Sequence, residues 1–266
     1  MEILSYDFMR HAVLAGLLAS IACGIIGSLV VVNRVVFVAG GISHAAYGGV
    51  GLAFFLGLPV LPITIAFSLG VSGIMAAVTF GRRERADTVV GVLWAAGMAF
   101  GIILMDLTHG YNVDLMSFLF GSILAVPESD LWLMAGLDVL LLAVILFNYR
   151  GFMAMSFDSE FAGLRGVHVR LLHFIMLAMI AASIVMIIRV VGLILVIALL
   201  TIPPYLAERR CRSLGGMMFS STLYSGVFCL AGLGLSYAYD LTSGASIIAV
   251  ATVWFFLDNV FGRRTA

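Results

Sequence analysis

The sequence comprises 266 residues, 63% hydrophobic and 11% charged, with a mean hydropathy of +1.17. Soluble domains have about a quarter of their residues charged, so this composition excludes a soluble globular enzyme and a disordered chain. The formal net charge is zero, so nothing attracts a polyanion and we expect no nucleic-acid partner. All 14 basic residues are arginine, and a P-loop requires a lysine for its nucleotide phosphates, so we expect any ATP hydrolysis to come from a separate subunit.

Apolar stretches recur along the whole chain and are long enough to cross a bilayer as helices. A barrel strand alternates apolar and polar residues over about ten positions, whereas these runs are continuous for about twenty. We therefore predict an all-α, polytopic membrane helical bundle that forms a single transmembrane domain over residues 1–266. We expect eight or nine transmembrane helices, because the second stretch is short and the boundary at Arg189 is soft. In chain order the stretches are 11–33, 44–58, 60–80, 88–107, 131–148, 171–188, 190–206, 216–237 and 245–261.

Arginine is concentrated in alternate connectors between these stretches, whereas the other connectors carry acidic residues. Because basic residues are retained on the cytoplasmic side of membrane proteins, we predict that the arginine-rich connectors are cytoplasmic and that residues 107–130 are external. The arginines concerned are Arg34, Arg82, Arg83, Arg85, Arg150, Arg165, Arg170, Arg209, Arg210, Arg212, Arg263 and Arg264.

The segment 34–51 places Ser43, His44 and Tyr47 within one helical turn and brackets them with paired glycines. An ionisable residue inside a membrane is costly and points to function, and neutral imidazole is a common ligand of transition metals. His44 and Tyr47 are three residues apart, so a helix puts them on one face. We therefore predict that these three residues contact a metal ion.

A second candidate for metal binding is the cluster of Asp106, His109 and Asp114 at the external end of the fourth stretch. Carboxylate and imidazole side chains suit a divalent ion such as zinc or manganese, although polar residues are also ordinary in a solvated loop. Asp138 lies in the fifth stretch without a local partner, and we expect it to line the path or to cap a neighbouring helix. Asp258, near the last arginines, is interpreted as an interfacial charge.

A short amphipathic helix is predicted in the longest cytoplasmic connector, at about residues 156–168. Its apolar side chains recur at near-helical spacing, and Gly166 is expected to turn the chain into the next span. Surface helices that lie on a bilayer are usually rich in basic residues, whereas this one carries acids at its start, so a protein partner is the better interpretation. The residues expected at that contact are Phe157, Asp158, Glu160, Phe161, Ala162 and Gly166.

Pro203 and Pro204 interrupt the seventh apolar stretch. Proline lacks a backbone donor, so we expect the pair to break the helix there, where freed carbonyls face protein or a cavity.

Five short motifs together connect the chain to a known family. They are Phe8-Met9-Arg10, Gly41-Ile42-Ser43-His44-Ala45, Leu119 to Val126, Phe157 to Ala162 with Gly166, and Gly192 to Pro204. Each motif is unspecific alone, but their order over the whole chain resembles the permease (transmembrane) subunit of ATP-binding-cassette importers of the zinc, manganese and iron family. The family commonly has an aspartate four residues before the histidine, and here that position is Gly40.

The resemblance implies a transport subunit rather than an enzyme, without a permanently bound cofactor, in a bacterial or archaeal cytoplasmic (inner) membrane. It implies a homodimer that works with cytoplasmic ATPase subunits, which dock on the connector helix, and with an extracytoplasmic metal-binding protein. The expected substrate is a divalent transition metal. With an imidazole and no hard carboxylate beside it, zinc is expected ahead of manganese or iron.

Two alternatives stay open. The same architecture could carry a metal chelate, such as a siderophore or a corrinoid, which would need a wider path without direct metal ligands. An ion-coupled secondary carrier would need no ATPase; such carriers often show inverted repeats with paired broken helices, and no convincing internal repeat is found here.

Overall fold

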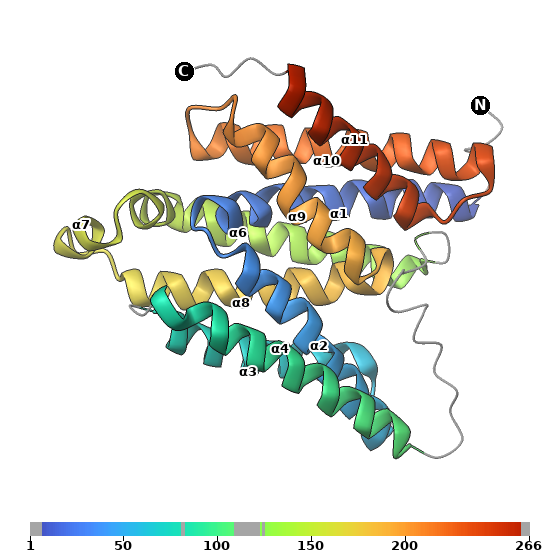
Figure 1. Ribbon diagram of the computed structural model, residues 1–266, viewed down its shortest axis with the longest axis horizontal. Coiled ribbons are helices and arrows are strands. Elements are labelled where there is room, and N and C mark those ends of the chain that lie inside the picture. The colour runs from blue at the N-terminus through green and yellow to red at the C-terminus, as the bar shows by residue number, and fades with distance from the viewer. Residues whose placement is uncertain (1–6, 81–82, 109–122, 124–125, 262–266) are drawn as a thin grey trace. The chain divides into compact units, whose positions relative to one another are not determined.

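The computed structural model describes residues 7–80, 83–108, 123 and 126–261, and these form helices and connecting turns (Figure 1). No strand occurs in these ranges, in agreement with the all-α prediction. The helices are α1 (Asp7–Val32), α2 (Val36–Leu56), α3 (Val60–Thr79), α4 (Arg83–Asp106), α6 (Glu128–Phe157), α7 (Ser159–Leu164), α8 (Val169–Val191), α9 (Leu193–Glu208), α10 (Leu214–Tyr239) and α11 (Ser243–Phe261).

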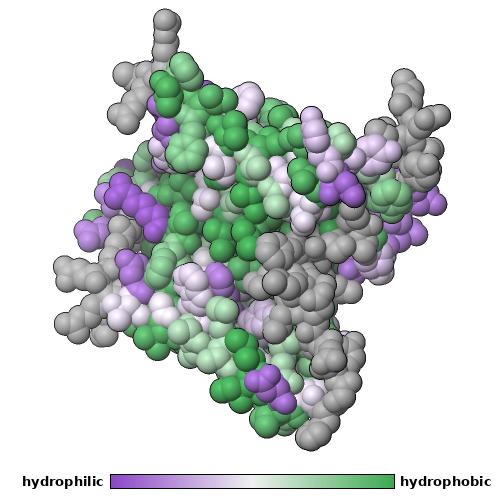
Figure 2. All heavy atoms as spheres, turned by 45° about the vertical axis from the view of Figure 1, so that its right-hand side comes forward, coloured by the Kyte–Doolittle hydropathy of each residue, from purple (hydrophilic) through white to green (hydrophobic). Residues whose placement is uncertain are grey.

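Eight helices of the described chain are long and apolar enough to cross a membrane, and α9, with 16 residues, is shorter. The prediction of eight or nine spans is therefore confirmed. Long apolar faces remain exposed on the outer helices, where hydrocarbon rather than water would cover them. Hydrophobic residues accordingly dominate much of the coloured surface in Figure 2. The described residues group into two compact units, which are taken here one at a time.

The first unit contains α1, α9, α10 and α11, the part of α6 up to Phe147 and the end of α8. Figure 1 shows α1 and α10 running alongside each other, and small residues hold them close. A Cβ built on Gly24 would lie 2.6 Å from the Cα of Thr222. Helices in lipid associate through such close contacts because no hydrophobic force drives them together.

Pro203 and Pro204 do not end α9, contrary to the expectation of a break: the helix runs unbroken from Leu193 to Glu208. Pro204 cannot donate to the carbonyl of Leu200, and Gly27 of α1 packs against that region. A Cβ built on Gly27 would lie 2.8 Å from the Leu200 oxygen and 2.7 Å from the Pro204 ring. Close packing of α1 therefore covers the site where the helical ladder is interrupted.

Two arginines hold a buried carboxylate of α11 in this unit. Arg209 Nη1 donates to Asp258 Oδ2 at 2.9 Å, and Arg210 Nη2 donates to Asp258 Oδ1. Arg210 also donates to the hydroxyl of Tyr224 at 2.7 Å. Asp258 is thus the centre of an ion-pair cluster, and this residue is only 8% exposed.

The second unit contains α2, α3, α4, α7, most of α8 and the last turns of α6. Glycines bring the backbones of α2 and α4 together. A Cβ built on Gly97 would lie 2.7 Å from the Cα of Ala45, and one built on Gly51 would lie 2.7 Å from the Cα of Gly101. Glycine disfavours an isolated helix by about 1 kcal/mol per residue, but here the missing side chains permit the helix contact.

The helix predicted at 156–168 is shorter in the structure and begins and ends at identifiable residues. The span α6 extends to Phe157, Asp158 caps α7, and Gly166 adopts φ +81° to turn the chain into α8. That φ favours glycine, because a Cβ would be strained there. Figure 1 shows α7 at the turn between α6 and α8.

Candidate functional site

The three residues predicted on α2 lie in its buried middle section and make different contacts. Ser43 is 1% exposed, and its hydroxyl donates to the carbonyls of Ala39 and Gly40. Tyr47 is also buried. His44 is half-buried. Because the Ser43 hydroxyl is already used within its own helix, the imidazole of His44 is the stronger candidate for a metal ligand.

His44 lies against a tryptophan that the sequence analysis did not single out. Its imidazole stacks on the indole of Trp94 of α4, with ring centroids 4.1 Å apart and planes inclined by 14°. The Nδ1 atom of His44 is buried and finds no hydrogen-bond partner. A buried polar atom normally has a partner, so this nitrogen without a partner makes His44 a candidate ligand.

The side of α2 one turn before His44 is open. A Cβ built on Gly40 would meet no heavy atom within 4 Å, whereas one built on Gly41 would approach Met75 Cε to 3.3 Å and crowd Val90. Gly40 and His44 are four residues apart and share a helix face. The position where the family commonly carries an aspartate therefore has room for a side chain in this chain.

Of the second predicted cluster, the structure describes only Asp106. Asp106 is the exposed last residue of α4, nine residues beyond Gly97, or about 14 Å along a helix. His109 and Asp114 lie outside the described residues. Among the residues that the structure describes, no three His, Cys, Asp or Glu side chains could hold a metal ion together. The described part of the site therefore offers a single imidazole, which suits transient rather than permanent binding.

Asp138 is a second ionisable residue buried in an apolar helix. It is 5% exposed, and its Oδ2 atom finds no hydrogen-bond partner. Cys23 lies within electrostatic range of Asp138 and of Cys229, and the hydroxyl of Ser20 donates to the Cys229 sulfur at 3.5 Å. These residues all lie in the first unit. Among the described residues, they do not form a group of three side chains that could hold a metal ion.

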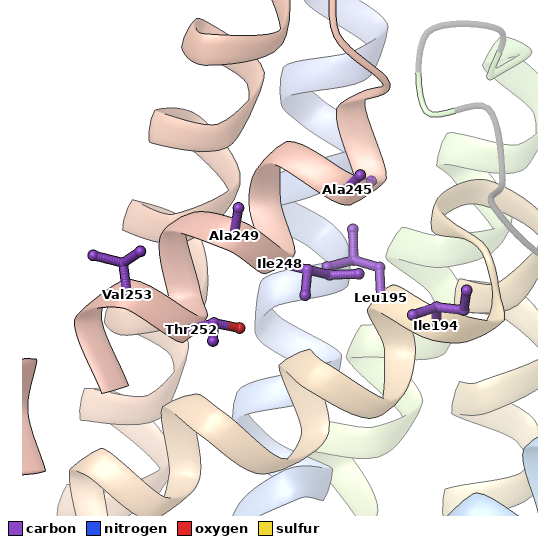
Figure 3. Close-up of a pocket in the computed structure, with 8 residues that line it drawn as sticks. Ile194, Leu195, Ala245, Ile248, Ala249, Thr252 and Val253 are labelled. Atoms are coloured by element: carbon purple, nitrogen blue, oxygen red, sulfur yellow. The ribbon is translucent and has the colours of Figure 1, made fainter. Parts of the chain in front are cut away.

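A cavity of about 470 Å³ lies between α9 and α11, but its chemistry does not suit an ion (Figure 3). Apart from Thr252, every lining residue has an aliphatic side chain or is glycine, including Leu195 and Ile248. A divalent cation needs oxygen or nitrogen ligands. This cavity therefore fits an apolar occupant.

The residues predicted to contact an ATPase surround α7 and differ in exposure. Phe157, Phe161 and Glu160 are exposed, whereas Ala162 is 1% exposed and packs within the chain. The Asp158 carboxylate accepts from the backbone N–H groups of Glu160 and Phe161, at 3.0 and 2.9 Å. Asp158 therefore shapes the start of α7 as an N-cap.

Leu164 was not named as a contact residue, yet it is 88% exposed. Together with Phe157 and Phe161, it gives the connector three exposed apolar side chains. The near-helical spacing of apolar residues in this segment includes Leu164.

The fold, a set of long apolar helices with a capped connector helix, is that of a polytopic membrane protein. Residues 5–262 match the model of the ABC 3 transport family. The chain belongs to this family and is a permease subunit of an ATP-binding-cassette transporter.

Relatives and a solved structure match over nearly the whole chain. An uncharacterized membrane protein of Synechocystis sp. is 46% identical over 98% of this chain and 93% of its own length. The manganese transport system membrane protein MntC of Halalkalibacterium halodurans is 31% identical over 99% and 90%. The solved structure of PsaBC from Streptococcus pneumoniae in complex with a Fab fits with a TM-score of 0.88 at 27% identity, covering 99% and 95%.

Proposed function

We propose that this chain is the membrane permease of an ATP-driven importer whose substrate is a divalent transition metal, and that the metal is manganese. Two findings support this proposal: the family match, and relatives named as manganese transport proteins that are 31% and 30% identical to this chain. The preference for zinc, expected from the sequence because no carboxylate accompanies His44, is therefore replaced by manganese.

The observation that carries the proposal is the orphaned Nδ1 of His44 in a glycine-framed helix. A neutral imidazole is tolerated in a membrane and still binds a transition metal. Manganese prefers oxygen ligands, so we propose that the ion keeps several waters while one imidazole per chain contacts it. A single contact gives a weak site that releases its ion, as conduction through a path requires.

The partners follow from the same proposal. Two copies of the chain form a central path, and ATPase subunits in the cytoplasm dock on α7. Exposed Phe157, Phe161 and Leu164 form the apolar part of that contact. An extracytoplasmic metal-binding protein delivers the ion from the face that carries Asp106. The membrane is the cytoplasmic membrane of a bacterium.

Uptake of radioactive manganese tests the proposal directly. The chain is produced with its ATPase and binding protein in a strain without manganese or zinc importers of its own. We expect ATP-dependent manganese uptake that falls at least about tenfold in His44→Gln, since one metal contact is lost. His11→Gln, which removes a half-buried imidazole from α1 instead, should transport normally.

Zinc uptake in the same cells separates the two metals. Preferential transport of zinc would contradict the choice of manganese but not the importer. Normal manganese transport by His44→Gln would remove His44 from the path.

A further inference from the structure

Trp94 lies flat against the imidazole of His44. The Nδ1 atom of that imidazole is the buried nitrogen without a hydrogen-bond partner. The ring centroids are 4.1 Å apart and the planes are inclined by only 14°. In a parallel stack of this kind the ring nitrogens of the imidazole point sideways, within the plane of the ring. The indole therefore determines the plane in which His44 can present a nitrogen to an ion.

Trp94 is itself held in place within α4. Its Nε1–H donates to the sulfur of Met98 at 3.2 Å, and Phe37 of α2 lies against it with ring centroids 6.0 Å apart. A tryptophan N–H usually finds a partner when the ring is buried, and here the partner lies one helical turn away. The indole is thus held by one contact within α4 and by another from α2.

The approach of α2 to α4 sets the stacking distance. Gly97, three residues after Trp94, packs on Ala45, the residue after His44, so closely that a Cβ on Gly97 would lie 2.7 Å from the Ala45 Cα. A side chain at this contact would separate the helices and with them the two rings. The stack therefore depends on the small residues of the interface.

The face of an indole carries negative electrostatic potential, which attracts a cation or a positively charged ring. An imidazole that binds a divalent ion gains positive character. We propose that Trp94 is a positioning residue for the transported metal: it orients the imidazole of His44 and stabilises its metal-bound form. This inference rests on the proposed function, in which His44 contacts the ion.

Fluorescence of Trp94 tests the inference without relying on transport. The chain has three tryptophans; the other two, Trp132 and Trp254, are 71% and 46% exposed and can be replaced by phenylalanine. The single-tryptophan transporter, assembled with its ATPase in lipid nanodiscs, is titrated with manganese ions, which are paramagnetic. We expect a saturable loss of Trp94 emission that disappears in His44→Gln and persists in His11→Gln.

Uptake kinetics supply the second readout. Trp94→Leu should raise the manganese concentration for half-maximal uptake about tenfold, the size of one cation–π contact, and leave the maximal rate within about twofold. Trp94→Phe, which retains an aromatic face, should restore most of the loss. Trp132→Leu is the matched control and should behave like the unmodified chain.

The outcomes separate the two proposals. The role of Trp94 is overturned, and the importer proposal stands, if three results are found together. These are that manganese does not change Trp94 emission, that Trp94→Leu transports normally, and that His44→Gln does not. If His44→Gln also transports normally, both proposals are overturned, because no metal-bound imidazole is left for Trp94 to orient. If Trp94→Leu does not assemble, uptake by Trp94→Phe and the emission titration still test the role of Trp94.

Discussion

Two ionisable residues in apolar helices, Asp258 of α11 and His44 of α2, have opposite surroundings. Both oxygens of Asp258 accept hydrogen bonds from arginines, Arg209 and Arg210. His44 stacks on a neutral ring, and its buried Nδ1 has no partner. A charge that is fully paired holds helices together, whereas a polar atom without a partner keeps its bonding capacity for something that arrives later. The two side chains thus differ in what remains free to bind: both oxygens of Asp258 are occupied, whereas one buried nitrogen of His44 is not.

The largest expected effect is at the paired residue. Asp258→Ala leaves two arginines without their shared buried carboxylate, and breaking such a pair costs about 3–5 kcal/mol. We expect a large fall in the unfolding temperature of the purified protein in detergent. Asp240→Asn should have little effect, because Asp240 is exposed and asparagine tolerates its positive φ of 53°. An unchanged unfolding temperature in Asp258→Ala would show that the cluster does not stabilise the fold.

A carboxylate introduced beside His44 would give this residue a charged neighbour, as Asp258 already has. Gly40→Asp places a carboxylate on the open side of α2, one turn before the imidazole. We expect half-maximal manganese uptake at a concentration about tenfold lower, because one charged ligand adds roughly 1.4 kcal/mol of binding.

The matched control for this change is Gly41→Asp. A side chain there would crowd Val90 and Met75, so we expect poor assembly rather than tighter binding. If Gly40→Asp leaves the concentration dependence of uptake unchanged, the open side of α2 does not face the ion.

Replacing each of two buried aspartates by asparagine tests how much a partner contributes to stability. Asp138 is as buried as Asp258, but its Oδ2 has no partner. Asp138→Asn replaces a buried acid that has one oxygen without a partner, so we expect stability to be unchanged or to rise by about 1 kcal/mol. Asp258→Asn removes one charge of the paired cluster and should lower stability. Thermal unfolding of both variants provides the measurement, and a similar loss in each would indicate that Asp138 has a stabilising partner.

The smallest expected effect is at the exposed connector. Asp158→Ala removes the N-cap of α7, which is worth about 1 kcal/mol, and should weaken the stimulation of ATP hydrolysis by the assembled transporter. Asp158→Asn keeps a capping oxygen and should retain most of that stimulation. Equal losses in the two variants would show that the negative charge, and not the cap, matters for the contact.

Much of the fold could be predicted from local pattern. The long apolar stretches were found as helices because twenty consecutive apolar residues have few other stable conformations in a bilayer. The turn at Gly166 and the existence of α7 were also predicted, although α7 itself spans only Ser159–Leu164. The break expected at Pro203 was wrong, because packing of α1 on α9 outweighs the local preference of proline.

The class of the molecule, the helices and the candidate histidine could be predicted from the amino-acid sequence, since these depend on composition and on residues near one another in the chain. The tertiary structure decided which side chains meet. Asp258 pairs with Arg209 and Arg210, which are 49 and 48 positions away, and His44 stacks on Trp94. Such meetings depend on how each helix is rotated and how closely two backbones approach. Neither quantity is present in the hydrophobic pattern of a single helix.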